Sequence, residues 1–282
     1  GLKFLVELTS KTLDTDIKSI KKAARKGVKE ELNKRVNTII ENEEISIDKD
    51  SKIIWKSYPI GKLKKGHNYL NPEIEIIADE VIELETKNKL IGFLKKWFNK
   101  YIKDVLGDLI NLTKQKTDNQ YLRALIFQLY EKNGVLKRKN VDNIIKLIPS
   151  VDRKKLWGMG IKIGRYHIYL PKMLKPKAVE FRISLWKIFY NLTKKQEIPK
   201  FGLNFLINKD LEQNFLLLCG FEKFNDYFVR IDILEKLFIK ILDNSKDRKF
   251  KINSEMMNLL GCTKENFYKL MNYMDYKKDK AE

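Results

Sequence analysis

Residues 158–176, GMGIKIGRYHIYLPKMLKP, interrupt a helical pattern in the middle of the chain. From about residue 81 to residue 150, apolar residues recur at three- and four-residue steps, which is the period of an amphipathic helix. A further helix is expected near residues 179–192. The interrupting segment holds three glycines, an aromatic run around His167 and several basic residues. We therefore expect a basic loop rich in glycine and aromatic residues, set into a mostly helical domain.

Upstream of this domain, strand and helix patterns follow one another. Residues 2–8 alternate apolar and polar, which predicts a half-buried strand, and residues 17–39 predict an amphipathic helix. Turn signals at residues 48–51 and 57–59 separate short apolar stretches between residues 45 and 63, which predicts a small β-meander. The face of the predicted helix at residues 17–39 opposite its apolar residues is basic. It is either simply exposed to solvent or suited to binding a phosphate backbone. Its basic residues are Lys18, Lys21, Lys22, Arg25, Lys26 and Lys29.

The last part of the chain predicts a small α/β section. A helix ends at Cys219-Gly220, a strand covers Tyr227 to Ile231, and a helix starts at Asp232. Residues 254–274 read as helix, tight turn at Gly261 and capped helix. This spacing is that of a helix-turn-helix, although an ordinary helical hairpin has the same pattern.

The fold class predicted from these patterns is α+β and mostly helical. It comprises a small β-meander near the N-terminus, a central helical bundle and an α/β C-terminal section with a possible helix-turn-helix. We expect three sections, residues 1–78, 79–192 and 193–282, of which the second carries the basic glycine- and aromatic-rich loop.

The charge of the chain indicates a polyanionic partner. Its 282 residues include 57 Lys and Arg against 37 Asp and Glu, which gives a net charge of +20. Such a field attracts nucleic acid. The basic residues are 48 lysines and only 9 arginines, in a chain also rich in Ile and Asn, so an AT-rich codon bias explains part of the excess. The acidic residues do not balance the lysines, however, and the excess positive charge that codon bias does not explain indicates an anionic partner.

Several classes of protein are disfavoured. No apolar run approaches the roughly 20 residues that span a bilayer, so no membrane partner is expected. Two cysteines in unrelated contexts and the absence of a signal-peptide pattern indicate a reducing, cytoplasmic compartment. The chain begins Gly1-Leu2-Lys3-Phe4 without an initiator methionine, and we expect the natural protein to continue upstream.

No motif assembles a catalytic centre. The run IEIIADE at residues 74–80 resembles a Walker B strand, but no phosphate loop accompanies it, and helix capping by Asp79 or Glu80 is the simpler interpretation. The glycines at 158, 160 and 164 do not have dinucleotide-binding spacing, although such a loop offers backbone N–H groups to phosphates. His67 and His167 lack neighbouring ligands, so no metal site is expected, and His167 reads as a hydrogen-bonded structural group rather than a base.

The best candidate for a nucleic-acid surface surrounds the loop. Rings such as Trp157 and Tyr169 stack on unpaired bases while cations hold phosphates. The alternative is that the rings belong to the core and the lysines are merely exposed. The candidate nucleic-acid-binding residues are Arg153, Lys154, Lys155, Arg165, Tyr166, His167, Lys172, Lys175 and Lys177.

Four groups of residues carry a resemblance to a known family. They are residues 55–63 (WKSYPIGKL) with 72–80 (PEIEIIADE), residues 123–129 (RALIFQL) with 134–136 (GVL), residues 160–171 (GIKIGRYHIYLP) with 174–176 (LKP), and residues 219–221 (CGF), 229–235 (VRIDILE) and 259–262 (LLGC). The chain resembles, nearly end to end, the C-terminal region of large helicase-related proteins of alphaproteobacteria. These resemble the ATP-dependent helicases of the mitochondrial RNA degradosome.

The resemblance implies a parent protein that is an ATP-driven helicase of the 3′–5′ type, acting on RNA, while the strand bound by this chain is either RNA or DNA. Its two ATPase lobes, with ATP and magnesium as cofactors, would lie upstream, and none of their catalytic residues matches a position here. The chain would be an accessory region that binds a single strand, with no reaction of its own. The alternative is a platform that docks a nuclease or ribosomal partner. The family is richer in arginine where this chain has lysine, which puts sequence-specific recognition in doubt.

Overall fold

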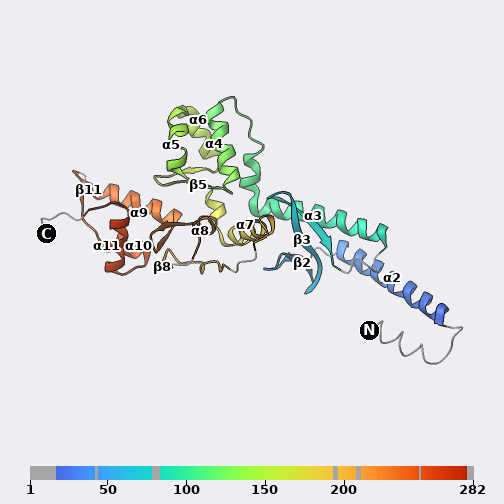
Figure 1. Cartoon of the computed structure of the whole chain (residues 1–282). Coiled ribbons are helices and arrows are strands. Elements are labelled where there is room, and N and C mark those ends of the chain that lie inside the picture. The colour runs from blue at the N-terminus through green and yellow to red at the C-terminus, as the bar shows by residue number, and fades with distance from the viewer. Residues whose placement is uncertain are drawn as a thin grey trace. The chain divides into compact units, whose positions relative to one another are not determined.

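The computed structural model describes residues 17–41, 44–77, 83–192, 196–207, 211–247 and 249–277 (Figure 1). The strand expected at residues 2–8 and the pair Asp79 and Glu80 lie outside these ranges. So do the side chains of residues 17–22, 25 and 29, which include most of the basic residues expected on the first helix. None of the helices in the described ranges is both long and apolar enough to cross a bilayer. The predicted class, α+β and mostly helical, is confirmed.

The chain forms two compact units. The first comprises Gly1–Lys100 with Ile188–Asn191, and the second comprises Tyr101–Lys187 with Leu192–Glu282. Two helices, α3 (Leu84–Leu112) and α7 (Pro176–Phe189), contribute residues to both units. The boundary expected at residue 192 falls next to this division, whereas the one at residue 78 lies inside the first unit.

The first unit contains the predicted amphipathic helix and the predicted meander. Helix α2 covers Ile17–Glu41, and four antiparallel strands follow in the order β1-β2-β3-β4. Of the run that resembled a Walker B strand, residues 74–76 belong to the edge strand β4 of this meander. Thr86 at the start of α3 donates a hydrogen bond to Asn33 of α2 at 2.5 Å. The strands are β1 (Ile45–Ile47), β2 (Lys52–Trp55), β3 (Tyr58–Asn68) and β4 (Asn71–Ile76).

The turn between β2 and β3 shows why the meander closes at this point. Trp55 pairs with Tyr58, so only Lys56 and Ser57 form the loop, and both have positive φ, 44° and 71°. Two consecutive left-handed residues match the type I′ geometry that suits the twist of a two-residue hairpin. The turn signal in the sequence therefore marks a real hairpin, although neither residue is a glycine.

The second unit begins with helices around a small sheet. The sheet has the order β5-β7-β6 and is antiparallel. It contradicts the expectation of helices throughout residues 81–150, because β5 lies within that stretch. Three residues of strand are too short to disturb a helical period, and Gly134, with φ of 84°, ends helix α4 just before them. The elements are α4 (Gln120–Glu131), β5 (Val135–Lys137), the 3₁₀ helix η2 (Arg138–Asn140), α5 (Asp142–Leu147), α6 (Ser150–Gly158), β6 (Lys162–Ile163), β7 (His167–Tyr169) and the 3₁₀ helix η3 (Pro171–Leu174).

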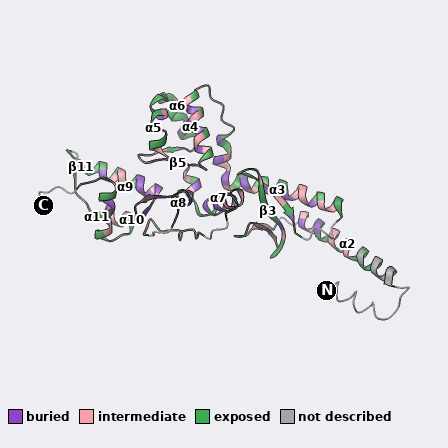
Figure 2. Cartoon of the chain, in the orientation of Figure 1, coloured by how far each residue is buried: buried purple, intermediate pink, exposed green. Residues whose placement is uncertain are grey.

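The predicted C-terminal strand and helices complete this unit. A second antiparallel sheet has the order β8-β10-β9 and is followed by α9, which buries Ile231, Ile233, Leu234, Leu237 and Ile241. Figure 2 shows buried and exposed residues along this helix. The elements are β8 (Phe205–Ile207), α8 (Gln213–Leu218), β9 (Phe221–Phe224), β10 (Tyr227–Arg230), α9 (Ile231–Asp243), β11 (Ser245–Lys246), β12 (Lys249–Phe250), α10 (Ser254–Leu260) and α11 (Lys264–Tyr273).

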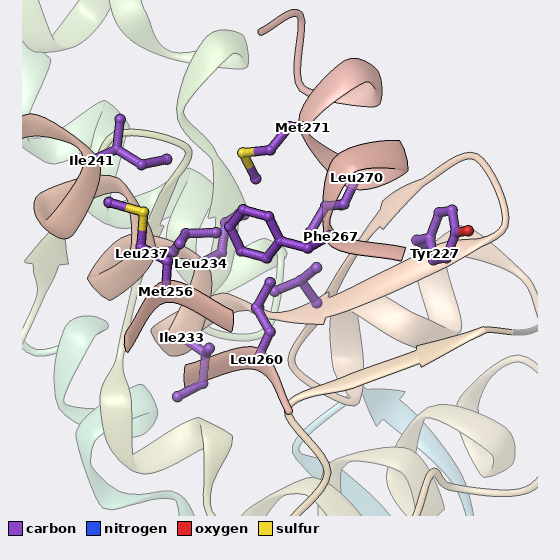
Figure 3. Packing of buried hydrophobic residues seen from close by; sticks show 11 residues of the cluster. Tyr227, Ile233, Leu234, Leu237, Ile241, Met256, Leu260, Phe267, Leu270 and Met271 are labelled. Atoms are coloured by element: carbon purple, nitrogen blue, oxygen red, sulfur yellow. The ribbon is translucent and has the colours of Figure 1, made fainter. Parts of the chain in front are cut away.

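The last two helices form the predicted helical hairpin. Gly261 ends α10 in the left-handed conformation, with φ of 68°, and the Thr263 hydroxyl caps α11 by accepting from the Asn266 N–H at 3.3 Å. Figure 3 shows side chains of α9, α10 and α11 directed toward one another, with the Phe267 ring among them. A role of this hairpin as a DNA-binding helix-turn-helix stays a prediction.

Candidate nucleic-acid interface

A groove of about 960 Å³ lies on the second unit, at the glycine-rich loop. The loop supplies one wall, and α6 and α9 supply others, so the groove joins segments more than 70 residues apart in the sequence. All its lining residues belong to this one unit. They are Asp108, Arg138, Trp157, residues 160–165, Tyr169, Pro171, Lys172, Leu174, Asp232, Glu235, Lys236, Phe238 and Ile239.

An aromatic and apolar surface is open to solvent in this groove. The Trp157 side chain, at the end of α6, is 72% exposed. Ile239 on α9 is also exposed, and Phe238 beside it is half-buried. A tryptophan with so large an exposed fraction is uncommon, since a ring of this size gains much free energy from burial. It is suited to stacking against a flat partner.

Positive charge surrounds this surface. Lys162 and Lys236 are exposed and have no ion-pair partner within the described part of the chain. The Arg165 guanidinium lies 5.7 Å from the centre of the Phe238 ring, a cation–π arrangement, and Arg165 is exposed. The fourth cation, Lys172, is 2.9 Å from the Asp108 carboxylate, but an exposed pair of this kind is weak and easily exchanged.

The glycine-rich loop is held in place by a buried carboxylate. Glu235 of α9 accepts hydrogen bonds from the backbone N–H groups of Arg165, Tyr166 and His167 at 2.6, 2.9 and 2.9 Å. A Cβ on Gly164 would lie 2.2 Å from the same carboxyl group, so a side chain there would collide with it. Glu235 therefore occupies these three N–H groups, which are not available to a phosphate.

His167 joins this carboxylate to a second one. Its Nε2 is 2.7 Å from Oε2 of Glu222 on β9, and its Nδ1 is 3.7 Å from Oε1 of Glu235. Lys137 of β5, which pairs with His167 across the sheet, also donates to Glu222. The imidazole is only 1% exposed. The interpretation of His167 as a hydrogen-bonded structural group therefore agrees with its position, and its ring does not reach the surface.

The protonation of this cluster follows from its contacts. Burial works to lower the pKa of His167, but the hydrogen bond to Glu222 and the attraction of the Glu235 carboxylate 3.7 Å away outweigh it and raise the pKa above the ordinary value of 6.5. Burial works to raise the pKa values of both glutamates. Hydrogen bonds from His167 and Lys137 nevertheless lower the pKa of Glu222 below 4.5, and the nearby His167 ring together with the three backbone N–H groups lowers that of Glu235. The contacts thus favour the charged form of each of the three groups, with the imidazole ring between two carboxylates.

We expect this cluster to make stability fall above neutral pH. A raised folded-state pKa of His167 stabilises the fold fully below the unfolded value near 6.5, and this contribution is lost as pH rises through the folded value. The lowered pKa values of Glu222 and Glu235 stabilise the fold above about pH 4.5. This stabilisation is lost only as the pH falls through the pKa values of the two groups in the folded state. Urea unfolding should therefore show a His167→Gln variant roughly 2 kcal/mol less stable at about pH 6, with the gap narrowing toward pH 9.

The comparison with the variant is itself the control, since the pH response of the other charged groups is common to both proteins. Parallel stability curves between pH 6 and pH 9 would contradict an imidazolium at this position.

The structure brings part of the predicted surface together. Arg165 and Lys172 line the groove beside Trp157, whereas Tyr169 is buried in the core and is not available for stacking. Burial raises the pKa of Tyr169 to about 12, and it also raises the pKa of the half-buried Tyr166.

The remaining predicted residues lie elsewhere. Arg153 donates to the Ile148 carbonyl at 2.9 Å, and Lys154 and Lys155 are exposed on α6. Lys175 lines a separate hollow of about 150 Å³. Lys177 lies 5.0 Å from the centre of the Tyr101 ring.

Sequence reasoning missed three cations at the site: Lys162, Lys236 and Arg138. Lys162 lies within the glycine-rich segment at residues 158–176, so its position in the sequence was enough to include it among the candidate binding residues. Lys236 lies on the polar face of an amphipathic helix, where any lysine is unremarkable. Only the packing of α9 against the loop, through Glu235, reveals that this lysine faces the groove.

The groove has neither a group of metal ligands among the described residues nor a counterpart in a known protein. Among residues with described positions, no three His, Cys, Asp or Glu side chains are grouped so that they could hold a metal ion. The chain matches no protein-family model, no curated protein and no solved structure. The family resemblance stays a prediction, and function must be argued from the groove.

Proposed function

We propose that the second unit binds single-stranded nucleic acid, with RNA as the favoured form. The observation that carries this proposal is the exposed Trp157 indole in a groove with Lys162, Arg165 and Lys236. Proteins that bind single strands without base readout combine stacking rings with cations that follow the phosphates. Bases in a duplex are already stacked on both faces, so an exposed ring favours an unpaired strand.

The composition supports a partner with many phosphates. Lysine supplies most of the net charge of +20, and the ammonium group attracts phosphate without the two-point geometry of arginine. We propose that binding depends strongly on salt and weakly on base sequence. Together with the family resemblance, this leads us to propose that the chain is an accessory region of a cytoplasmic, ATP-dependent helicase, in which it captures a strand near the motor. ATP and magnesium belong to the upstream lobes in this proposal.

Stacking on Trp157 is open to direct measurement. Replacement of Trp157 with alanine should weaken binding of a single-stranded RNA of about ten nucleotides by roughly 10- to 100-fold, because stacking on one ring contributes about 1–3 kcal/mol. Fluorescence anisotropy of a labelled strand at low salt gives the affinity. The wild-type indole emission should be quenched on binding.

A Trp157→Phe variant is the matched control, since it keeps a stacking ring and removes the indole. It should retain most of the affinity and lose most of the quenching. If the unmodified chain fails to bind single-stranded RNA at about 50 mM salt, the proposed function is wrong.

A second candidate, a platform for a protein partner, is favoured by one feature. Ile239 and Leu242, three residues apart on α9, are both more than half exposed. Residues at this spacing share a face of a helix, and exposed apolar pairs of this kind occur at protein interfaces. A Leu242→Asp variant separates the two candidates: it leaves strand binding unchanged if the groove binds nucleic acid, because Leu242 does not line it.

A further inference from the structure

A smaller hollow of about 360 Å³ lies next to the groove and shares Arg138 and Arg165 with it. The two residues therefore stand at the junction of the two depressions. The size is of the order of one nucleotide, since small ligand sites begin at about 300 Å³. Its charged lining residues, besides His167, are Lys137, Arg138, Lys139, Asp142, Arg165 and Glu222.

The acidic groups of this hollow are already neutralised. Glu222 accepts from Lys137 and from His167, and Asp142 accepts from Arg138 and is paired with Lys146. Lys139 and Arg165 are exposed and have no ion-pair partner in the ranges that the structure describes. The hollow therefore presents uncompensated positive charge, which favours an anion.

Arg138 is fixed in position before any ligand arrives. Its Nε donates to the Asp142 carboxylate at 3.2 Å, and its Nη1 donates to the Gly164 carbonyl at 2.8 Å. Its backbone N–H donates to the Tyr166 carbonyl at 2.8 Å. Nη2 makes no hydrogen bond to any residue with a described position. A guanidinium held at two points loses little conformational entropy when it binds a third group.

Arginine is scarce in this chain, with 9 arginines against 48 lysines. Some of these arginines make several directed bonds: Arg182 donates to three carbonyls, and Arg230 makes two bonds to Asp232. Arg138 belongs to the same group, since its fork geometry is used on two sides.

We propose that Arg138, with Lys139 and Arg165, forms a phosphate-binding subsite at the junction of the two hollows. The phosphate is either a backbone phosphodiester or the terminal phosphomonoester of the bound strand. This inference rests on the proposed function in so far as the strand delivers the phosphate. The subsite also binds the phosphate of a free mononucleotide weakly, because its charges and its fixed donor do not depend on the rest of the groove.

The test compares Arg138→Gln with Lys114→Gln, a change of an exposed lysine that lines neither hollow. We expect Arg138→Gln to lower affinity for single-stranded RNA about tenfold and to reduce the salt slope by about 0.7, the value for one phosphate on a single strand. Lys114→Gln should change neither quantity. Wild-type affinity and slope in Arg138→Gln would overturn the inference while leaving the proposed function intact.

Strands with hydroxyl and with phosphate ends distinguish the two sources. If a terminal phosphate occupies the subsite, a 5′- or 3′-phosphorylated strand binds more tightly than its hydroxyl counterpart, and Arg138→Gln abolishes that gain. If a backbone phosphate occupies it, Arg138→Gln weakens all strands equally. Either result supports the subsite.

A second measurement is independent of strand binding. Adenosine 5′-monophosphate at about 10 mM should raise the melting temperature of the full chain, adenosine should not, and Arg138→Gln should remove the effect. A chain that binds no strand but shows this stabilisation retains the subsite and loses the proposed function. Because Arg138 also supports the loop, a Lys139→Gln/Arg165→Gln double variant repeats both measurements if Arg138→Gln fails to fold. Wild-type behaviour of that double variant would overturn the inference.

Discussion

Replacement of Arg182 with methionine is expected to lower the free energy of unfolding by about 3–5 kcal/mol, the largest stability loss that we expect from a single substitution. Arg182 lies on α7 and its side chain is 0% exposed. Its guanidinium donates to the carbonyl oxygens of Asn133, Met173 and Leu218 at 2.5, 2.5 and 2.8 Å. Asn133 follows α4, Met173 lies within η3, and Leu218 is the last residue of α8. One side chain therefore connects three segments of the chain.

The size of the effect follows from what the substitution leaves behind. Each carbonyl that loses its donor in the interior costs roughly 1–3 kcal/mol, and methionine supplies no N–H group. Folded domains are stable by about 5–15 kcal/mol, so the variant should lie close to its unfolding limit. Urea titration followed by circular dichroism gives the free energy of unfolding.

Two further variants make the measurement specific. Arg182→Lys retains the charge but reaches fewer of the three carbonyls, so it should recover only part of the loss. Arg123→Met removes an exposed arginine from the same unit and should change stability by less than about 0.5 kcal/mol. A loss at Arg182 no greater than that at Arg123 would contradict the role assigned to its three bonds.

The regular elements of the fold could be predicted from sequence because their signals are local. The helix at Ile17–Glu41 and the meander after it follow directly from apolar spacing and turn residues. The same is true of the helical hairpin that turns at Gly261. The strand Val135–Lys137 was missed because its partner, His167–Tyr169, lies some 30 residues later. Pairing at such a distance leaves no trace in a short window of sequence.

The candidate site was predicted only in part, for a related reason. Arg165, Lys172 and Trp157 lie in or near the loop that composition marks as unusual. Glu235, which fixes that loop, lies 70 residues downstream, and a glutamate in an amphipathic helix is ordinarily expected at the surface. The same carboxylate that takes the loop's backbone N–H groups also brings α9 into the groove. Glu235 therefore has two effects. It makes the loop's backbone N–H groups unavailable to a phosphate, and it places Lys236 of α9 in the groove.

Reversal of the four exposed groove cations, which leaves the half-buried Arg138 in place, is expected to weaken strand binding by roughly a hundredfold or more at about 0.1 M salt. The substitutions are Lys162→Glu, Arg165→Glu, Lys172→Glu and Lys236→Glu. All four side chains are exposed, so the fold should tolerate the changes, and circular dichroism checks this. If each cation neutralises about one phosphate, the slope of log affinity against log salt should fall by about 3.

The control must separate the groove from the total charge, because the chain carries +20 and any loss of lysine weakens a polyanion complex. A second variant reverses four other exposed lysines of the same unit, Lys114, Lys116, Lys246 and Lys251. None of these lines the groove, and both variants have the same net charge. At a salt concentration where the Debye length is about 10 Å, the control should lose only a few-fold in affinity, because its changed charges do not contact the strand. Equal losses in the two variants would mean that net charge, and not the groove at Trp157, holds the strand.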